Sequence, residues 1–113
     1  MCSQAVLNII TNRVVQAAKV SLGDKLDKVI LYGSYARGDF DDESDIDIMI
    51  LAEIQPENRG RERMKIRKFL GYIELELDLV VSLNVTDCKT FDTFLKVEPF
   101  YQNVMRDGVI LSA

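Results

Sequence analysis

A glycine-serine pair followed after ten residues by two aspartates could hold a phosphate group and a metal cation together. Gly33 and Ser34 end a short apolar run, and the backbone N–H groups and hydroxyl at such a turn commonly bind phosphate. Asp45 and Asp47 stand two residues apart in an alternating segment, so we expect their Cα atoms about 6.5 to 7 Å apart on one strand face. Carboxylates at that spacing can converge on Mg²⁺, which prefers carboxylate oxygens, water and substrate phosphates. The pattern therefore indicates a hard cation held beside a phosphate.

A third acid from a neighbouring strand would complete such a site. Asp78 is the leading candidate, because it follows Leu77 and precedes a hydrophobic run. A buried acid without a partner is costly, so an acid in that setting either binds a cation or lies on a solvated strand face. Glu74 and Glu76 share the predicted face with Asp78 and compete with it for the role.

The elements that must position these residues follow from hydrophobic periodicity. Helical spacing over residues 4–22, with Ser3 as N-cap and Gly23 as the stop, predicts an amphipathic helix. Alternation in Asp45–Leu51 predicts a strand with Asp47 and the isoleucines on opposite faces. The remaining expected elements are a strand at Val29–Tyr32, a loop at Glu53–Gly60, a basic helix at Arg61–Gly71 with Ile66, Phe69 and Leu70 on its apolar side, a strand at Ile73–Leu83, and helical structure from Thr86 to a stop at Gly108, followed by the apolar tail Val109–Leu111.

The length and these elements predict a single α/β (α+β) domain. Its 113 residues leave room for one compact unit. We expect one domain over residues 1–113, with an N-terminal helix at 4–22, a catalytic core at 28–83 and a C-terminal helical segment at 86–113.

Composition excludes several kinds of chemistry. The chain has no histidine, which rules out catalytic triads and histidine metal sites. Its net charge of −4 argues against direct nucleic-acid binding. Cys2 and Cys88 match no metal spacing and are expected to be reduced thiols. We find no signal peptide pattern and no apolar run long enough for a membrane span, so we expect a cytoplasmic protein.

The text GSYARGDFDDESDIDIMI, from Gly33 to Ile50, resembles the signature of the DNA polymerase beta-like nucleotidyltransferase superfamily. The fuller pattern is similar to the minimal nucleotidyltransferases, the MNT family that includes MntA-type antitoxins. The order of elements matches from about Asp24 to Leu111, so the resemblance covers most of the chain. It implies the nucleotidyltransferase fold, a small mixed β-sheet packed against helices.

The resemblance also implies roles for individual residues. Gly33 and Ser34 would hold the terminal phosphates of the nucleotide, and Arg37 would either contact phosphate or support the turn. Three catalytic and metal-binding acids, Asp45, Asp47 and Asp78, would ligate two Mg²⁺ ions. Asp78 would also help to deprotonate the attacking hydroxyl.

For function, the resemblance implies an Mg²⁺-dependent nucleotidyltransferase that uses ATP. MNT proteins are typically encoded beside a HEPN ribonuclease toxin. The resemblance therefore implies an antitoxin that adenylylates a tyrosine of that toxin. Two alternatives stay open. One is a binding antitoxin that occludes its partner without catalysis, and the other is a small-molecule nucleotidyltransferase whose acceptor site is assembled in a homo- or hetero-oligomer.

The basic run over residues 59–68 has three interpretations. It could bind nucleic acid, dock an acidic partner, or form a charged and solvated helix face, and the last is the commonest arrangement. The run comprises Arg59, Arg61, Arg63, Lys65, Arg67 and Lys68.

Overall fold

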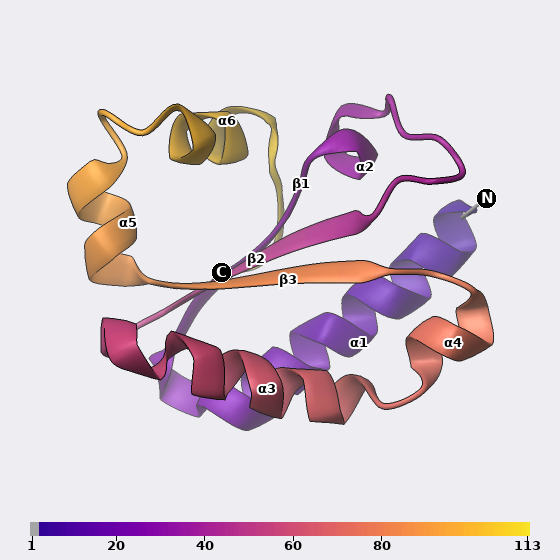
Figure 1. The fold of residues 1–113 in the computed structure, drawn as a ribbon, viewed down its shortest axis with the longest axis horizontal. Helices are drawn as coiled ribbons and strands as arrows, with labels where there is room; N and C mark the ends of the chain where they lie inside the picture. The colour runs from indigo at the N-terminus through magenta and orange to yellow at the C-terminus, as the bar shows by residue number, and fades with distance from the viewer. Residues whose placement is uncertain (1–2) are drawn as a thin grey trace.

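The protein folds as a four-stranded sheet with helices on both faces, in a computed structural model that describes residues 3–113 (Figure 1). Met1 and Cys2 lie outside the described residues. The strand order is β3-β2-β1-β4. The helices and strands are α1 (Gln4–Leu22), β1 (Leu26–Tyr32), α2 (Ser34–Arg37), β2 (Ile46–Ala52), α3 (Arg59–Leu70), α4 (Ile73–Leu77), β3 (Val81–Asp87), α5 (Cys88–Phe94), α6 (Pro99–Asp107) and β4 (Val109–Ser112), with 3-10 turns at Gly23–Lys25 and Pro56–Asn58.

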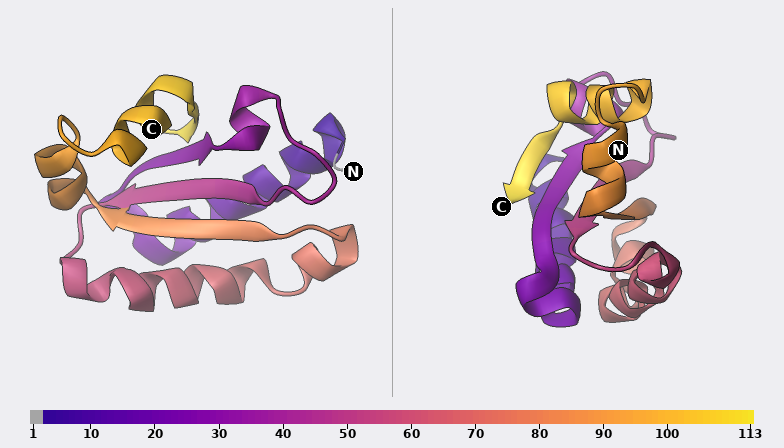
Figure 2. Two further views of the ribbon diagram at one scale, coloured as in Figure 1. Left: turned by 45° about the horizontal axis from the view of Figure 1, so that its top comes forward. Right: turned by 90° about the vertical axis from the view of Figure 1, so that its left-hand side faces the viewer.

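The helices form two layers. Figure 1 shows α3 and α4 below the strands and α5 and α6 above them, while α1 passes behind the strands toward α3; the left view of Figure 2 agrees. The larger core lies between the sheet and α1 with α3, and the smaller core lies between the sheet and α5 with α6. Among residues 3–113, no helix is long and apolar enough to cross a membrane.

Helix α1 begins and ends where the sequence predicts. The hydroxyl of Ser3 accepts a hydrogen bond from the backbone N–H of Val6 at 3.2 Å, and the N–H of Gly23 donates to the carbonyl of Lys19. Its buried stripe includes Ile10 and Val14, which are fully buried against the sheet. The predicted helix over residues 4–22 is confirmed.

Strand β2 places Asp47 on the sheet face that carries α5 and α6. Ile46, Ile48 and Ile50 point into the larger core, while Met49 packs in the smaller one. Because side chains alternate along a strand, Asp47 shares the face of Met49. The predicted separation of Asp47 from the isoleucines is confirmed.

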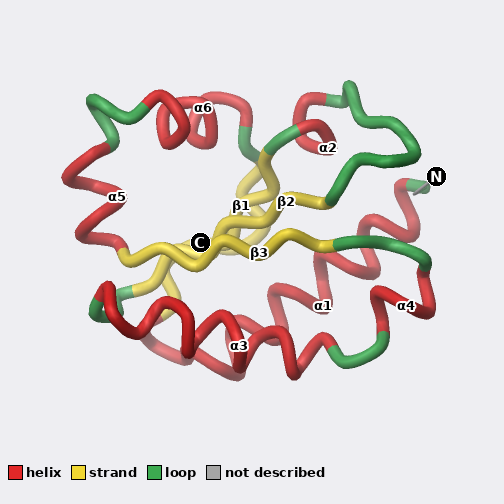
Figure 3. The backbone as a smooth tube through the Cα atoms, viewed as in Figure 1, coloured by secondary structure: helices red, strands yellow, loops and turns green. Residues whose placement is uncertain are grey.

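The predicted strand at Ile73–Leu83 is wrong in its first half. Residues Ile73–Leu77 form α4, Asp78 closes that helix in the left-handed conformation at φ 55°, and the strand runs instead over Val81–Asp87 (Figure 3). Alternation is also compatible with one helical turn, because Ile73 and Leu77 are four residues apart and both pack toward the larger core. Tertiary packing therefore overrides the local alternation.

Three smaller corrections concern the later elements. Thr86 lies within β3 rather than beginning a helix. The apolar tail forms strand β4, which pairs antiparallel with β1. Phe69 is 49% exposed, whereas Ile66 and Leu70 are buried as predicted.

Side chains of α3 and α4 cover the outer edge of β3. The Arg67 guanidinium donates to the Val81 carbonyl and pairs with Glu74, whose carboxylate accepts the Val81 N–H at 2.9 Å. The Nε–H of Arg63 donates to the Leu83 carbonyl at 3.0 Å. Backbone groups at a sheet edge can recruit another strand, and these contacts occupy them. Part of the basic run therefore has a structural task.

We expect Arg67→Ala to lower the free energy of unfolding by about 1 to 3 kcal/mol, because it removes the charge-assisted bonds to Glu74 and Val81. Urea denaturation measures the change. Lys68→Ala, on the exposed side of the same helix, is the matched control and should change stability by less than about 0.5 kcal/mol. Equal effects of the two substitutions would show that packing alone holds the β3 edge.

Candidate active site

Gly33 meets the carboxylate of Asp47 at the end of β1. Its φ of +75° is a conformation that residues with a side chain rarely adopt. A Cβ atom at this position would lie 2.3 Å from Oδ2 of Asp47 and 3.2 Å from its Cγ. Tyr32, the residue before Gly33, is the register partner of Asp47, so β1–β2 pairing fixes this approach. Only glycine leaves room for the carboxylate.

Four of the six predicted site residues line one pocket of about 350 Å³: Gly33, Ser34, Arg37 and Asp47. Ser34 and Arg37 are the first and last residues of the short helix α2, which begins directly after Gly33. The other lining residues come from the end of β1 and from α6. They are Tyr32, Phe100, Asn103, Val104 and Asp107.

The electrostatics of Asp47 suit a site that receives a cation. Burial raises the pKa of Asp47, and the neighbouring charge of Asp45 raises it further, while Arg37 opposes both effects. Arg37 is also engaged elsewhere, since its Nε–H donates to Asp39 at 3.2 Å. The negative charges of the two neighbouring carboxylates are only partly balanced by Arg37. Carboxylate oxygens are hard ligands of the kind that Mg²⁺ prefers. The residues present therefore fit a magnesium ion at Asp45 and Asp47.

Asp78 lies with Asp45 and away from the pocket that Asp47 lines. Asp45 and Asp78 are both exposed and line a separate pocket that also includes Asp42 and Glu43. No group of three metal-ligating side chains is assembled within the part of the chain that the structure describes. The structure thus brings Asp47 together with the glycine-serine turn, and leaves the predicted metal role of Asp78 as a prediction.

The residue beside Asp47 on the neighbouring strand is Ser82. Ser82 and Asn84 follow the same alternation that buries Val81 and Leu83, and that alternation could have located them on the site face. Our sequence analysis missed them because it placed Asp78, rather than Ser82, beside the Asp-x-Asp strand.

Tyr32 is a third residue that sequence reasoning missed. Its phenol pKa is raised by burial and then by the charge of Asp47, while a hydrogen bond with the Asn84 side chain acts in the opposite direction. The Tyr32 ring meets Phe100 of α6 edge to face, with centroids 5.5 Å apart. The signal available in the sequence was its position directly before Gly33.

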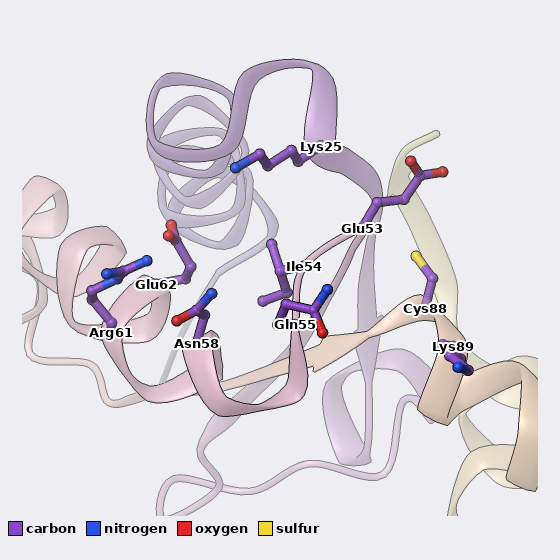
Figure 4. Close-up of a pocket in the computed structure, with 9 residues that line it drawn as sticks. All are labelled: Lys25, Glu53, Ile54, Gln55, Asn58, Arg61, Glu62, Cys88 and Lys89. Carbon is purple, nitrogen blue, oxygen red and sulfur yellow. The ribbon is translucent and has the colours of Figure 1, made fainter.

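A further pocket, of about 460 Å³, contains none of the predicted site residues (Figure 4). It lies where β2 ends and α5 begins, and its lining includes Glu53, Arg61 and Cys88. Burial, followed by the charges of nearby acids including Asp27 and Glu53, raises the pKa of the Cys88 thiol to about 11. A thiol with so high a pKa is a poor nucleophile at neutral pH.

Comparisons with known proteins identify the family of this chain. Residues 13–110 match the family model described as "Nucleotidyltransferase domain". The Methanocaldococcus jannaschii protein named "Putative protein adenylyltransferase MJ0141" is 49% identical over 61 residues, which are 54% of this chain and 60% of that protein. "Putative protein adenylyltransferase MJ0604" of the same organism is 30% identical over 97 residues, 86% of this chain and 89% of that protein. The chain therefore spans less than two thirds of the first relative and most of the second.

The fold is also that of a solved structure. The crystal structure of a toxin-antitoxin with AMP-PNP superposes with a TM-score of 0.58 and 24% identity, over 91% of this chain and 73% of that chain. At that identity the likeness shows the fold, and it confirms the predicted α/β nucleotidyltransferase architecture.

We expect Gly33→Ala to abolish binding of AMP-PNP and to lower the midpoint of thermal unfolding. The added methyl group would collide with the Asp47 carboxylate and is strained at positive φ. Isothermal titration calorimetry and circular dichroism measure the two effects. Gly38→Ala is the control, since Gly38 also has positive φ but a Cβ there would meet nothing within 4 Å. Equal loss of nucleotide binding in both variants would contradict the proposed closeness.

The pKa of Cys88 predicts slow alkylation at pH 8, where about one thiol in a thousand would be ionised, against about one in four for an ordinary cysteine. Cys2→Ser leaves Cys88 as the single thiol. The rate with iodoacetamide, followed by mass spectrometry, should rise about tenfold per pH unit from about pH 8 to 10. A plateau near pH 9 would show an ordinary thiol.

Proposed function

Because this chain belongs to the nucleotidyltransferase domain family, we propose that it transfers the AMP unit of ATP to a tyrosine hydroxyl of a HEPN toxin partner. The observation that carries the proposal is the closeness of the Gly33–Ser34 turn and the Asp47 carboxylate. That arrangement brings a phosphate-binding backbone and a cation-binding acid into one pocket, as nucleotidyl transfer requires.

Each site residue then has a role. Gly33 and Ser34 hold the terminal phosphates, and Arg37 adds positive charge to the same pocket. Asp45 and Asp47 would hold Mg²⁺, which would supply positive charge where negative charge develops during transfer. Asp78 lies on the Asp45 side, outside the pocket that Asp47 lines.

The reaction is an in-line substitution at phosphorus. The tyrosine oxygen attacks the α-phosphorus of ATP and forms a new P–O bond. The bond between that phosphorus and the oxygen bridging to the β-phosphate breaks, and pyrophosphate leaves with the electron pair. The hydroxyl proton is released to solvent. Two binding features would support this step: the Gly33–Ser34 turn binds the phosphates that leave, and the carboxylates of Asp45 and Asp47 would hold Mg²⁺ near the α-phosphorus.

The donor and the acceptor are supported by the relatives. Two curated relatives are named as protein adenylyltransferases, and a structural neighbour is a toxin-antitoxin bound to AMP-PNP, an ATP analogue. Residues 3–113 form one compact unit. A protein acceptor would bring its own binding surface to this unit.

We expect Asp47→Asn to lower transfer by about a hundredfold or more and to leave the fold intact, because it removes a charged ligand from the lining of the pocket. Asp78→Asn should lower transfer by less than about tenfold, since Asn also tolerates the left-handed conformation and Asp78 lies outside that pocket. Intact-protein mass spectrometry of the HEPN protein after incubation with Mg²⁺ and each nucleoside triphosphate measures the gain in mass.

Three outcomes would change the assignment. Equal loss with Asp47→Asn and Asp78→Asn would restore the three-acid site and require the segment before β3 to rearrange. No mass gain with any nucleotide, despite a stable complex, would favour an antitoxin that acts by occlusion. Rescue of cells from the toxin by the Asp45→Asn, Asp47→Asn double variant would show that catalysis is dispensable.

A further inference from the structure

Three side chains form a row across the sheet with Asp47 in the middle. Tyr32 on β1 is the register partner of Asp47 on β2, and Asp47 is the register partner of Ser82 on β3. Register partners on adjacent strands, about 4.8 Å apart, present their side chains to the same face. The phosphate turn follows Tyr32 at one end of the row, and at the other end side chains of α3 bond to backbone carbonyls of β3. The row therefore leads from the phosphate turn to α3.

A second pocket, of about 350 Å³, occupies the β3 end of this row. Tyr32 lines both this pocket and the one that holds Gly33 and Asp47, so the two adjoin at its ring. We call the second pocket the β3 groove. Its lining residues are Tyr32, Arg59, Gly60, Arg63, Ser82, Leu83, Asn84 and Val85.

The β3 groove is basic in an acidic protein. The chain has a net charge of −4, yet the lining contains Arg59 and Arg63 and no acid among the described residues. The hydroxyl of Ser82 and the amide of Asn84 add neutral polar groups. A pocket of this kind favours an occupant that carries carboxylates or phosphates.

Both arginines are anchored beside the groove. The Nε–H of Arg63 donates to the Leu83 carbonyl at 3.0 Å, and the Nε–H of Arg59 donates to the Pro56 carbonyl at 3.0 Å. Arg59 also lies 3.8 Å from Oδ1 of Asp87, a buried oxygen that has no hydrogen-bond partner. A guanidinium has five N–H donors, so one anchoring bond leaves others to bind a ligand. Anchoring lowers the entropy that each arginine loses on binding.

We propose that the β3 groove receives the acceptor as a peptide segment in which carboxylates flank the hydroxyl residue. In-line transfer needs the entering hydroxyl and the leaving pyrophosphate on opposite sides of the α-phosphorus. The pyrophosphate belongs to the Gly33–Ser34 turn, so the hydroxyl arrives from the side of Ser82. The inference rests on the proposed function and adds the acceptor's chemistry to it.

The nucleoside of ATP is the rival occupant of the groove. A base and a ribose carry no negative charge, and the phosphates already have a place at the turn. Two anchored guanidiniums match two carboxylates better than they match a nucleoside. The charge of the groove therefore favours the acidic peptide.

Two fluorescein-labelled peptides test the inference, one with Tyr flanked by two Glu on each side and one with Gln in place of Glu. Fluorescence anisotropy with AMP-PNP and Mg²⁺ measures their binding. The unmodified protein should bind the Glu peptide at least about tenfold more tightly than the Gln peptide, with a preference that falls as salt rises. AMP-PNP affinity is measured in parallel by calorimetry.

Matched double variants of α3 locate the effect. Arg59→Gln with Arg63→Gln should abolish the preference for the Glu peptide and leave AMP-PNP affinity within about twofold of the original. Arg61→Gln with Lys68→Gln removes the same charge from residues outside the groove and should keep the preference. Arg59→Lys with Arg63→Lys retains the positive charge and should keep most of the preference for the Glu peptide. This variant distinguishes loss of charge from a folding defect in the Arg59→Gln, Arg63→Gln variant.

The other outcomes are decisive. Equal affinity of the unmodified protein for both peptides, or an unchanged preference in the Arg59→Gln, Arg63→Gln variant, would overturn the inference while the proposed function stands. Loss of AMP-PNP affinity in that variant would assign the groove to the nucleoside and also overturn it. Failure of the unmodified protein to bind AMP-PNP would overturn the proposed function, and the inference with it.

Discussion

The closeness of the Gly33 backbone to the Asp47 carboxylate is the constraint on which the rest of the site depends. The carboxylate occupies the space that a Cβ atom at residue 33 would need, so any other residue type would separate the phosphate turn from the acid. The antiparallel pairing of Tyr32 with Asp47 brings the two strands to this point. A phosphate held by the turn is consequently within reach of a cation held by the acid, with no intervening side chain.

Burial of Asp47 beside the charge of Asp45 creates an electrostatic cost that a cation can relieve. Burial and Asp45 raise the pKa of Asp47, so ionised Asp47 is less favourable in the folded chain than in the unfolded one. An acid with a raised folded-state pKa destabilises the fold at pH values above that pKa, where both states are ionised. A divalent cation between the two carboxylates would reverse this penalty. Binding of metal and nucleotide should therefore stabilise the fold at neutral pH. Without them, Arg37 offsets only part of the effect of burial and of Asp45 on the Asp47 carboxylate.

Local signals were sufficient to predict α1, the glycine-serine turn and the alternation of β2. Each has a residue type that allows few alternatives: the Ser3 cap, the glycine at positive φ, and isoleucines that must all face one core. Ser82 and the α6 residues of the site could not be predicted in this way, because they join it through strand register and helix packing. Those contacts depend on partners far away in the sequence.

The misplacement of Asp78 shows why alternation alone cannot fix register. Apolar residues occupy every odd position from Ile73 to Val85, so sliding this segment along β2 by two or four residues would still bury an apolar face. A shift of two would set Asp78 opposite Asp45, and a shift of four would set it opposite Asp47. The bonds that distinguish these registers are polar.

The Glu74 carboxylate accepts the Val81 N–H, and Arg67 donates both to Glu74 and to the Val81 carbonyl. These bonds fix where β3 begins after α4, and they place Ser82 beside Asp47. Helix α3 thus determines which side chain completes the row at Asp47, and through Arg59 and Arg63 it also sets the charge beyond that row. The basic helix is therefore part of the construction of the site, because a different β3 register would change both the neighbour of Asp47 and the groove that adjoins it.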